Sequence, residues 1–339
     1  MVNFVTIMRK LIEDFPIQIE DALFALKKQE SKLHDEKANG FQPSGVLILG
    51  MGGSGIGGAF VASILRKSST IPILTTADYN IPGWVNNETL VIACSNSGNT
   101  EETLKAASDA FNRNANVACV TSGGKLEEFA LANELPIVKI PAGFPPRSQF
   151  GHSFLSLAWT LERFGIFPNQ LYLEFEASAE SLSLNASKVK ERAETISELI
   201  YDKNIHIYSD TDTECVAIRW RQQLNENSKL LVNSHVFPEL NHNELVGWAA
   251  GSEHDVVLII RTSEDSARTK VRMDLSAEII QEMGADVIFI DANGESRIHE
   301  FMDLVFLGDY ISLLLAEKQE VDPVEIENII RLKSKLSEL

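Results

Sequence analysis

Residues 46–58 read VLILGMGGSGIGG, a short apolar run that leads directly into a glycine-rich turn. The apolar run predicts a buried strand, and glycines let backbone N–H groups approach a ligand at the start of the next helix. The turn therefore predicts a site for an anion. The same residues also satisfy the GxGxxG pattern, and Asp78 would suit a ribose-binding acid, so this motif alone leaves a dinucleotide site open.

Further short apolar runs follow the glycine turn at the spacing of repeated βα units. In the first half of the chain they cover residues 71–74, 90–94, 117–121 and 137–140. Runs of this kind predict strands that are buried on both faces of a parallel sheet. Before the glycine turn, residues 5–29 carry apolar side chains at helical spacing, and Pro16 predicts a break between two helices.

The second half repeats this architecture without repeating the sequence. Its first segment, residues 177–201, has the pattern of a long amphipathic helix. Strands are then expected at residues 205–208, 256–260 and 287–290, with a helix at residues 267–283. A chain of 339 residues also exceeds the ~250 residues beyond which a single core usually splits. We therefore predict an α/β fold of two doubly wound, flavodoxin-like parallel-sheet domains, residues 1–175 and residues 176–339.

Composition narrows the class of protein. The formal net charge of -18 opposes binding to nucleic acid and to anionic membranes, because the field of the protein repels polyanions. No apolar run approaches the ~18 residues needed to span a bilayer, and residues 1–15 do not resemble a signal peptide. The three cysteines show no CxxC spacing and the seven histidines are scattered, which favours a cytoplasmic protein without a metal or another cofactor.

A second polar loop follows the third expected strand and reads SNSGNTEET at residues 95–103. Ser95, Ser97 and Thr100 cluster around a glycine where a helix is expected to begin, so hydroxyls, backbone N–H groups and the positive helix end would together hold a phosphate. The alternative is a simple helix cap by Asn99. Because neighbouring parallel strands end at one edge of the sheet, this loop and the glycine turn are expected to share a ligand.

The glycine turn and the SNSGNTEET loop together resemble the sugar-isomerase (SIS) domain of phosphosugar isomerases. The resemblance implies that Gly53, Ser54, Ser95, Ser97 and Thr100 bind the phosphate of a sugar substrate. Isomerisation of an aldose to a ketose then needs three more groups. These are a base for the proton that moves between C1 and C2, a cation near the enediolate oxygens, and a group that opens the sugar ring.

The sequence offers one candidate for each of these roles. Arg147 follows a stiff diproline, Glu226 lies among the amides of residues 223–229, and His242 lies in a polar loop. Histidine is the side-chain type commonly used for proton transfer near neutral pH. Neighbouring amides are expected to orient the Glu226 carboxylate by hydrogen bonds. The alternatives are ordinary ones: a surface arginine, a solvated helix end and a solvated histidine.

Taken together, these segments resemble the bifunctional phosphoglucose/phosphomannose isomerases, whose two SIS domains span essentially the whole chain. The resemblance implies that Glu226 is the C1/C2 proton-transfer base, that Arg147 stabilises the enediolate, and that His242 opens the ring from the partner subunit of a homodimer. It also implies that Lys333 of the last helix assists at the sugar ring, although Lys335 is close by. The implied reaction converts glucose 6-phosphate, and mannose 6-phosphate, into fructose 6-phosphate through a cis-enediolate.

Two other functions compete with this one. The same domain occurs in non-catalytic sugar-phosphate sensors, but these normally carry a DNA-binding module, and no basic helix-turn-helix segment is evident here. An oxidoreductase with a dinucleotide on residues 50–55 would leave residues 95–100 unexplained. The range of epimers also stays open, because Val324 and Ile326 stand where a small hydroxyl residue is expected for mannose.

Overall fold

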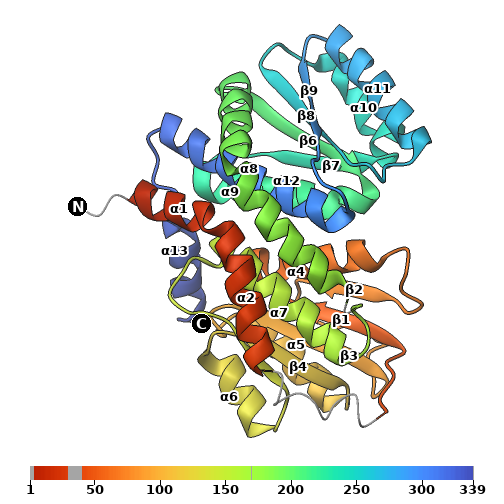
Figure 1. Cartoon of the computed structure of the whole chain (residues 1–339), viewed down its shortest axis with the longest axis vertical. Helices are drawn as coiled ribbons and strands as arrows, with labels where there is room; N and C mark the ends of the chain where they lie inside the picture. The colour runs from red at the N-terminus through yellow and green to blue at the C-terminus, as the bar shows by residue number, and fades with distance from the viewer. Residues whose placement is uncertain (1–3, 30–39, 169, 339) are drawn as a thin grey trace.

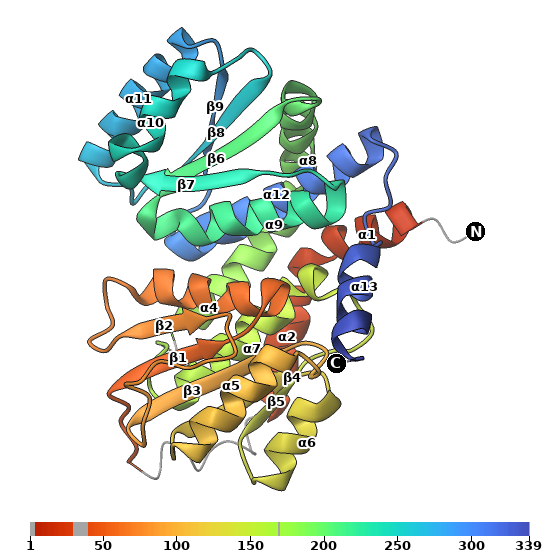
Figure 2. The same cartoon turned by 180° about the vertical axis from the view of Figure 1, so that it is seen from behind.

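The structure, a computed structural model, describes residues 4–29, 40–168 and 170–338. Its first parallel sheet has five strands in the flavodoxin-like order β2-β1-β3-β4-β5 (Figures 1 and 2). From β1 the chain adds β2 on one side and then β3, β4 and β5 on the other, so the strand order reverses between β1 and β3. Ligands of such sheets bind at this point, outside the carboxyl ends of the strands. The strands of this sheet are β1 (Gly45–Leu49), β2 (Ile73–Thr76), β3 (Thr89–Ser95), β4 (Asn116–Thr121) and β5 (Ile137–Lys139).

The second parallel sheet has four strands in the order β7-β6-β8-β9 and repeats the first arrangement with one strand fewer. The predicted fold of two doubly wound parallel-sheet domains is therefore confirmed. The sequence prediction missed β7, because this edge strand is a five-residue segment of mixed polarity that is only partly buried. The strands of this sheet are β6 (Asn204–Asp210), β7 (Asn233–Phe237), β8 (Asp255–Arg261) and β9 (Asp286–Asp291).

Two prolines explain where neighbouring elements begin. The second strand starts at Ile73, later than expected, because Pro72 has no N–H to donate to the sheet, although its carbonyl accepts a hydrogen bond from Val46 N at 2.9 Å. The break expected at Pro16 is confirmed, since α1 (Phe4–Glu13) ends before it. Pro16 itself lies in the first turn of α2 (Phe15–Gln29), where a missing N–H costs no intrahelical hydrogen bond.

The helices that cover the two sheets are α4 (Gly52–Leu65), α5 (Glu101–Asn112), α6 (Gly124–Ala132), α7 (Phe150–Arg163), α9 (Glu214–Ser228), α10 (Glu244–Gly247), α11 (Ala267–Glu282) and α12 (Arg297–Lys318). On the first sheet, α4 and α7 pack on one face and α5 and α6 on the other. On the second sheet, α9 and α12 pack on one face, and α11 packs on the other. Within the described residues, no helix is long and apolar enough to cross a membrane.

A single long helix, α8 (Leu171–Ile200), runs from one domain to the other (Figure 1). It begins earlier than the predicted residue 177, and near its start Phe175 packs on Phe154 of α7 with ring centroids 5.5 Å apart. Farther along it packs against α12. The division predicted between residues 175 and 176 falls inside this helix, and the domain boundary stays a prediction.

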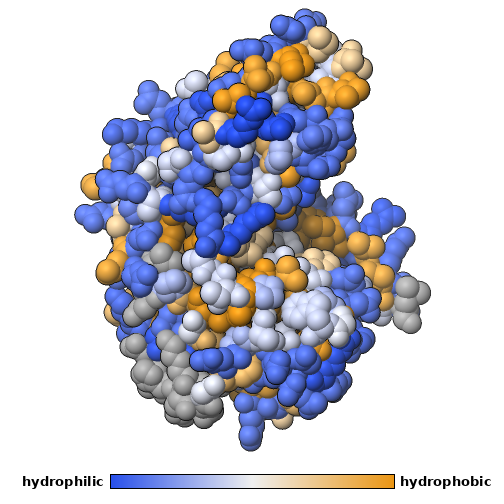
Figure 3. Space-filling model, turned by 90° about the vertical axis from the view of Figure 1, so that its right-hand side faces the viewer, coloured by the Kyte–Doolittle hydropathy of each residue, from blue (hydrophilic) through white to orange (hydrophobic). Residues whose placement is uncertain are grey.

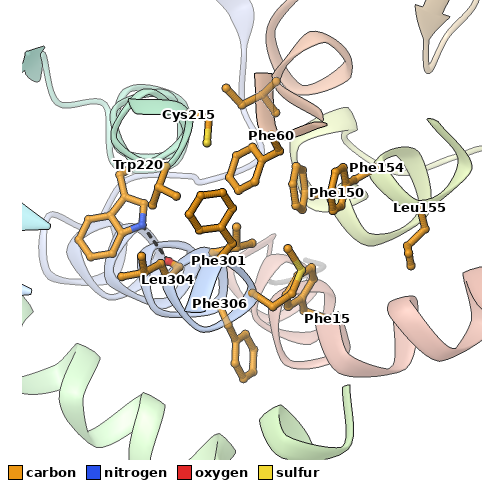
Figure 4. Close-up of a cluster of buried hydrophobic side chains, with 14 of the residues drawn as sticks. Phe15, Phe60, Phe150, Phe154, Leu155, Cys215, Trp220, Phe301, Leu304 and Phe306 are labelled. Atoms are coloured by element: carbon orange, nitrogen blue, oxygen red, sulfur yellow. Dashed lines mark hydrogen bonds between the residues drawn. The ribbon is translucent and has the colours of Figure 1, made fainter. Parts of the chain in front are cut away.

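One hydrophobic core joins the two domains (Figure 4). At its centre, the ring of Phe60 from α4 lies 4.8 Å from Phe150 of α7 and 5.5 Å from Phe301 of α12. The indole of Trp220 donates a hydrogen bond of 2.8 Å to the carbonyl of Leu304, which ties α9 to α12. Burial of these large rings stabilises the pairing of the domains, because aromatic side chains bury more apolar area than other residues.

The surface viewed from the side is indented between the two domains (Figure 3). Hydrophilic side chains cover most of this face, and hydrophobic side chains gather in smaller patches. The last helix, α13 (Glu327–Leu336), contributes no buried side chain and lies beside α1 (Figure 2). The segment between α12 and α13 therefore carries the chain back across the junction of the domains.

Candidate active site

The glycine turn lies between β1 and α4, and it touches the loop that carries Arg147. Helix α4 begins at Gly52, with Met51 as its N-cap. A Cβ atom on Gly53 would come within 2.9 Å of the backbone nitrogen of Arg147 and 3.0 Å of its Cα. Only glycine permits this approach, so the glycine turn and Arg147 are held side by side.

The SNSGNTEET loop lies between β3 and α5. The hydroxyls of Ser95 and Thr100 are 2.9 Å apart, and Gly98 N donates to the Ser95 hydroxyl at 3.1 Å. Gly98 has a φ of 66° and packs so tightly that a Cβ atom there would overlap the carbonyl of Gly123. Ser97 is exposed, and its hydroxyl accepts a hydrogen bond from Asn99 N at 3.2 Å.

The simple capping alternative for this loop does not fit the structure. The N-cap of α5 is Thr100, and its side chain makes no capping hydrogen bond. The Asn99 side chain instead accepts from Lys125 N at the start of α6, at 3.2 Å. A hydrogen bond of 3.0 Å from Asn96 N to the Ser54 hydroxyl joins the two loops. Hydroxyls, N–H groups and two helix N-termini thus meet where β1 and β3 end, which suits a phosphate.

Arg147 is not a solvated loop arginine. It belongs to the short helix η1 (Pro146–Ser148) and is only 4% exposed. Its Nε donates to Asn227 Oδ1 at 2.6 Å, its Nη1 to Glu226 Oε2 at 3.1 Å, and its Nη2 to the Pro323 carbonyl at 2.5 Å. Burial lowers the pKa of Arg147, and the adjacent Glu226 carboxylate acts against this shift. The guanidinium remains a cation, because its pKa starts far above neutral.

Glu226 lies in the last turn of α9, and its side chain is partly exposed. Arg147 orients it, whereas the sequence predicted that neighbouring amides would do so. The Asn227 amide is buried and bonds Arg147 and the Ser312 hydroxyl instead. The prediction was wrong because successive helix residues point about 100° apart, so Asn227 cannot turn toward Glu226. Among the described residues, the second carboxylate oxygen of Glu226 accepts no hydrogen bond.

A buried ion pair behind Arg147 escaped the sequence analysis. Arg219 donates to Asp309 at 2.6 Å and to the Arg147 carbonyl at 3.2 Å, and Gln223 donates to the same carboxylate at 2.6 Å. Burial raises the pKa of Asp309, and the Arg219 cation opposes that shift. The available signal was Asp309 inside the apolar run of residues 304–316 of α12, since such a carboxylate needs a buried partner.

The segment before α13 closes on this site. Pro323 accepts from Arg147, and Lys229 donates to the carbonyls of Glu226 and Glu325 at 2.6 and 2.8 Å. Lys333 lies farther along α13, is exposed, and makes no side-chain hydrogen bond or ion pair within the described residues. Lys335 is exposed as well, so the contacts of α13 do not favour either lysine.

His242 is remote from Glu226 within one chain. It ends the short helix η3 (Glu239–His242), beyond the carboxyl end of β7, and its side chain is exposed. Glu226 lies at the end of α9, which leads into the start of β7. The two residues therefore lie toward opposite ends of the second sheet, a separation of the order of the ~22 Å length of α9. No hydrogen bond or ion pair of the described chain joins them.

The chemistry of the site rests on one cation, one carboxylate and a cluster of neutral donors. The part of the chain described by the structure contains no group of three His, Cys, Asp or Glu side chains arranged to hold a metal ion. Asp78, the candidate ribose-binding acid, is exposed, and its carboxylate accepts from Asn80 N at 3.0 Å. A phosphate at the loops and a reacting carbon between Arg147 and Glu226 are the ligand groups that this arrangement suits.

Comparisons with known proteins agree with this geometry. Residues 189–336 match the model of the bacterial phospho-glucose isomerase C-terminal SIS domain. Two relatives, each a bifunctional phosphoglucose/phosphomannose isomerase, match this chain over most of their lengths. The protein of Caldicellulosiruptor bescii is 36% identical over 306 residues, covering 87% of this chain and 90% of the relative. The protein of Aquifex aeolicus is 35% identical over 295 residues, covering 86% and 90%.

A solved structure shows the same fold at lower identity. The tagatose-6-phosphate ketose/aldose isomerase of Escherichia coli superposes with a TM-score of 0.73, at 14% identity, over 94% of this chain and 95% of that one. The fold of the whole chain is thus shared with a phosphosugar isomerase, and the sequence match with the two relatives is long enough to decide the family. The chain belongs to the family of bifunctional phosphoglucose/phosphomannose isomerases.

Proposed function

We propose that this protein is an aldose–ketose isomerase that interconverts glucose 6-phosphate, and mannose 6-phosphate, with fructose 6-phosphate. The observation that supports it most is the contact of the buried Arg147 guanidinium with the Glu226 carboxylate at 3.1 Å, next to the glycine turn. A base and a fixed cation at one point are what proton transfer through an enediolate needs. The names of the relatives from Caldicellulosiruptor bescii and Aquifex aeolicus support the same substrates.

In the proposed mechanism Glu226 moves one proton between two carbons. With the open-chain aldose, its carboxylate takes the proton from C2, the C–H electrons form the C1–C2 double bond, and the carbonyl electrons move onto O1. The resulting cis-enediolate is stabilised by Arg147. Glu226 then returns the proton to C1, the proton of the C2 hydroxyl passes to O1, and the ketose results with its carbonyl at C2 and a hydroxyl at C1. One carboxylate on one face of the substrate serves both carbons.

Arg147 suits the role of enediolate stabiliser because it is held rigidly. A guanidinium has five N–H groups. Three of them are engaged by Asn227, Glu226 and Pro323, which leaves two for the oxygens of the intermediate. Donors that are oriented before the reaction stabilise developing charge without reorganisation, and this is usually the largest electrostatic contribution to catalysis.

The phosphate of the substrate would lie against Gly53, Ser54, Ser95, Ser97 and Thr100. The hydroxyls of Ser95 and Thr100 already lie 2.9 Å apart, so rotation of their hydrogens would point both at a phosphate oxygen. The N-termini of α4 and α5 add partial positive charge. These local donors explain how a protein with a net charge of -18 can bind a dianion.

We further propose a cytoplasmic homodimer in which His242 opens the sugar ring at the partner's site. The separation of His242 from Glu226 within one chain supports this arrangement, because a histidine at the far end of the second sheet does not reach Glu226 of its own chain. Lys333, or Lys335 near it, would assist at the ring from α13. A sensor without catalytic activity is less favoured, since ligand binding alone does not require a carboxylate against the buried arginine.

A direct assay tests the proposal. The protein is incubated with fructose 6-phosphate, and glucose 6-phosphate and mannose 6-phosphate are scored separately by chromatography. We expect glucose 6-phosphate from the wild-type protein in the presence of EDTA, and none at a comparable rate from the Glu226→Gln variant. A folded wild-type protein that forms neither aldose phosphate would overturn the function, and the ratio of the two products measures the range of epimers.

A further inference from the structure

A cavity whose lining includes neither Arg147 nor Glu226 lies between α8 and the segment that joins β9 to α12. Its volume is about 290 Å³, at the lower end of the ~300–1,000 Å³ typical of small-molecule sites. From α8 it is lined by Ser181, Asn185, Lys188 and Arg192, and from the other side by Asn293, His299 and Asp303. We name this space the α8–α12 cavity.

The α8 side of the cavity is basic although the helix is acidic. Helix α8 contains six glutamates, and none of them lines the cavity. The lining side chains recur at helical spacing and include Lys188 and Arg192, one turn apart on the same face. Like charges four residues apart destabilise a helix by a few tenths of a kcal/mol unless something neutralises them. A protein of net charge -18 thus keeps two cations together at a cavity.

The charged groups of the cavity differ in how they are paired. Arg192 donates to Asp303 at 3.4 Å and also to the Asp291 carbonyl, so it is fixed in place. Lys188 donates to the Asn185 side chain at 3.1 Å and, among the described residues, has no carboxylate partner. An anion at the cavity would therefore find Lys188 available.

Asp303 is the one acidic side chain that the described lining contains, and its charge is engaged. It accepts from Asn293 N at 3.0 Å as well as from Arg192. Burial raises the pKa of Asp303, and the hydrogen bonds from Asn293 and the charge of Arg192 act against this shift. The side chain of His299, on the same wall, makes no hydrogen bond within the described residues and offers a further donor.

We propose that the α8–α12 cavity binds a small phosphate ester, with the phosphate against Lys188 and His299 and the hydroxyls of the ester against Ser181, Asn185 and Asn293. The volume exceeds what a bare phosphate ion needs, and the neutral lining groups can donate to and accept from alcohols. The cavity shares no residue with the candidate active site. Along α12, His299 and Asp309 are about 15 Å apart, so the same helix carries groups of both sites.

Binding measurements on matched variants test this proposal. The probe is glycerol 3-phosphate, which carries a phosphate and two hydroxyls, titrated by calorimetry into the full-length protein. In the Ser97→Ala/Thr100→Ala background, whose first phosphate site is weakened, we expect one molecule bound per chain. Adding Lys188→Gln and His299→Gln should weaken this binding at least tenfold, whereas Lys190→Gln, the same change of charge on α8 outside the cavity, should leave it unchanged.

Each outcome decides the proposal. The Lys188→Arg variant keeps the positive charge that Lys188→Gln removes, so it should retain most of the binding. This comparison separates the loss of a charged ligand contact from damage to α8. No binding to the Ser97→Ala/Thr100→Ala protein, or an equal loss with Lys190→Gln, would overturn the site. Inorganic phosphate should bind more weakly than glycerol 3-phosphate, and equal affinity of the two probes would overturn the assignment of an ester.

Discussion

Nη1 of Arg147 lies 3.1 Å from Oε2 of Glu226, although the two residues are 79 positions apart and belong to different domains. Arg147 is held from behind, because Asn227 and Pro323 accept hydrogen bonds from its guanidinium and Arg219 donates to its backbone carbonyl. The junction between the domains therefore brings these two side chains together, and neither domain contains the pair alone. Predictions about the site follow from this arrangement.

The Glu226→Gln variant should lose catalysis while it keeps substrate binding. Glutamine preserves the shape of the side chain and a hydrogen bond to Arg147 but cannot accept the proton, so kcat should fall by about 10²-fold or more with KM nearly unchanged. Glu214→Gln, the same substitution at the exposed start of α9, should leave both constants unchanged. Steady-state kinetics with fructose 6-phosphate makes the comparison. Near wild-type kcat in Glu226→Gln would remove the base from this residue and turn attention to Glu239 and Glu244.

The Ser97→Ala/Thr100→Ala double variant should bind substrate poorly. Each lost charge-assisted hydrogen bond to the phosphate costs roughly 1.5–3 kcal/mol, so KM should rise more than about tenfold. Ser69→Ala removes a hydroxyl that bonds only within its own turn, to the Ile71 carbonyl, and serves as the control. An unchanged KM in a folded double variant would place the phosphate elsewhere.

Two inactive variants should complement each other if His242 serves the partner's site. Co-expressed Glu226→Gln and His242→Ala chains form hybrid dimers, in which one of the two sites is complete. Random pairing predicts about one quarter of the wild-type activity, because half the dimers are hybrids. Differently tagged chains allow the hybrids to be isolated and assayed. Isolated hybrids without activity would contradict the shared site.

The Asp309→Asn substitution should destabilise the protein more than an exposed substitution of the same kind. It leaves the buried Arg219 cation without its carboxylate, which costs about 3–5 kcal/mol of unfolding free energy. Asp286→Asn breaks the exposed pair with Lys203, and there we expect a loss below about 1 kcal/mol. Urea unfolding of both variants measures the two values. Similar losses at the two positions would show that the buried pair adds no special stability.

The three cysteines should be inert to thiol reagents in the folded protein. Burial raises the pKa of Cys94, Cys119 and Cys215 from an ordinary 9.0 to about 12, so the reactive thiolate is scarce at pH 8. The pKa of each thiol is higher in the folded protein than in the unfolded chain. The contribution of the protonated thiols to the free energy of unfolding is therefore fully present below about pH 9 and is lost as the pH rises toward 12. Ellman's reagent at pH 8 should detect no thiol before denaturation and three after it. A rapidly reacting thiol in the native protein would contradict the burial.

Much of the fold was predictable because local patterns encode it. Short apolar runs predicted eight of the nine strands, and Pro16 marked the break between the first helices. The missed strand, β7, is an edge strand, and its partly exposed residues need no continuous apolar run. The early start of α8 was also missed, since the apolar contact of Phe175 with Phe154 comes from another helix.

The sequence by itself determined the glycine turn and the SNSGNTEET loop and their place at the ends of β1 and β3. It also marked Arg147 and Glu226 as candidates. Tertiary structure alone decided that these two residues touch, that Asn227 faces Arg147 rather than Glu226, and that Arg219 pairs with Asp309. The physical reason is range: turns and strands are set by neighbours in the chain, whereas a buried ion pair needs two distant segments brought together. That approach depends on the aromatic core between the domains, whose packing no local pattern specifies.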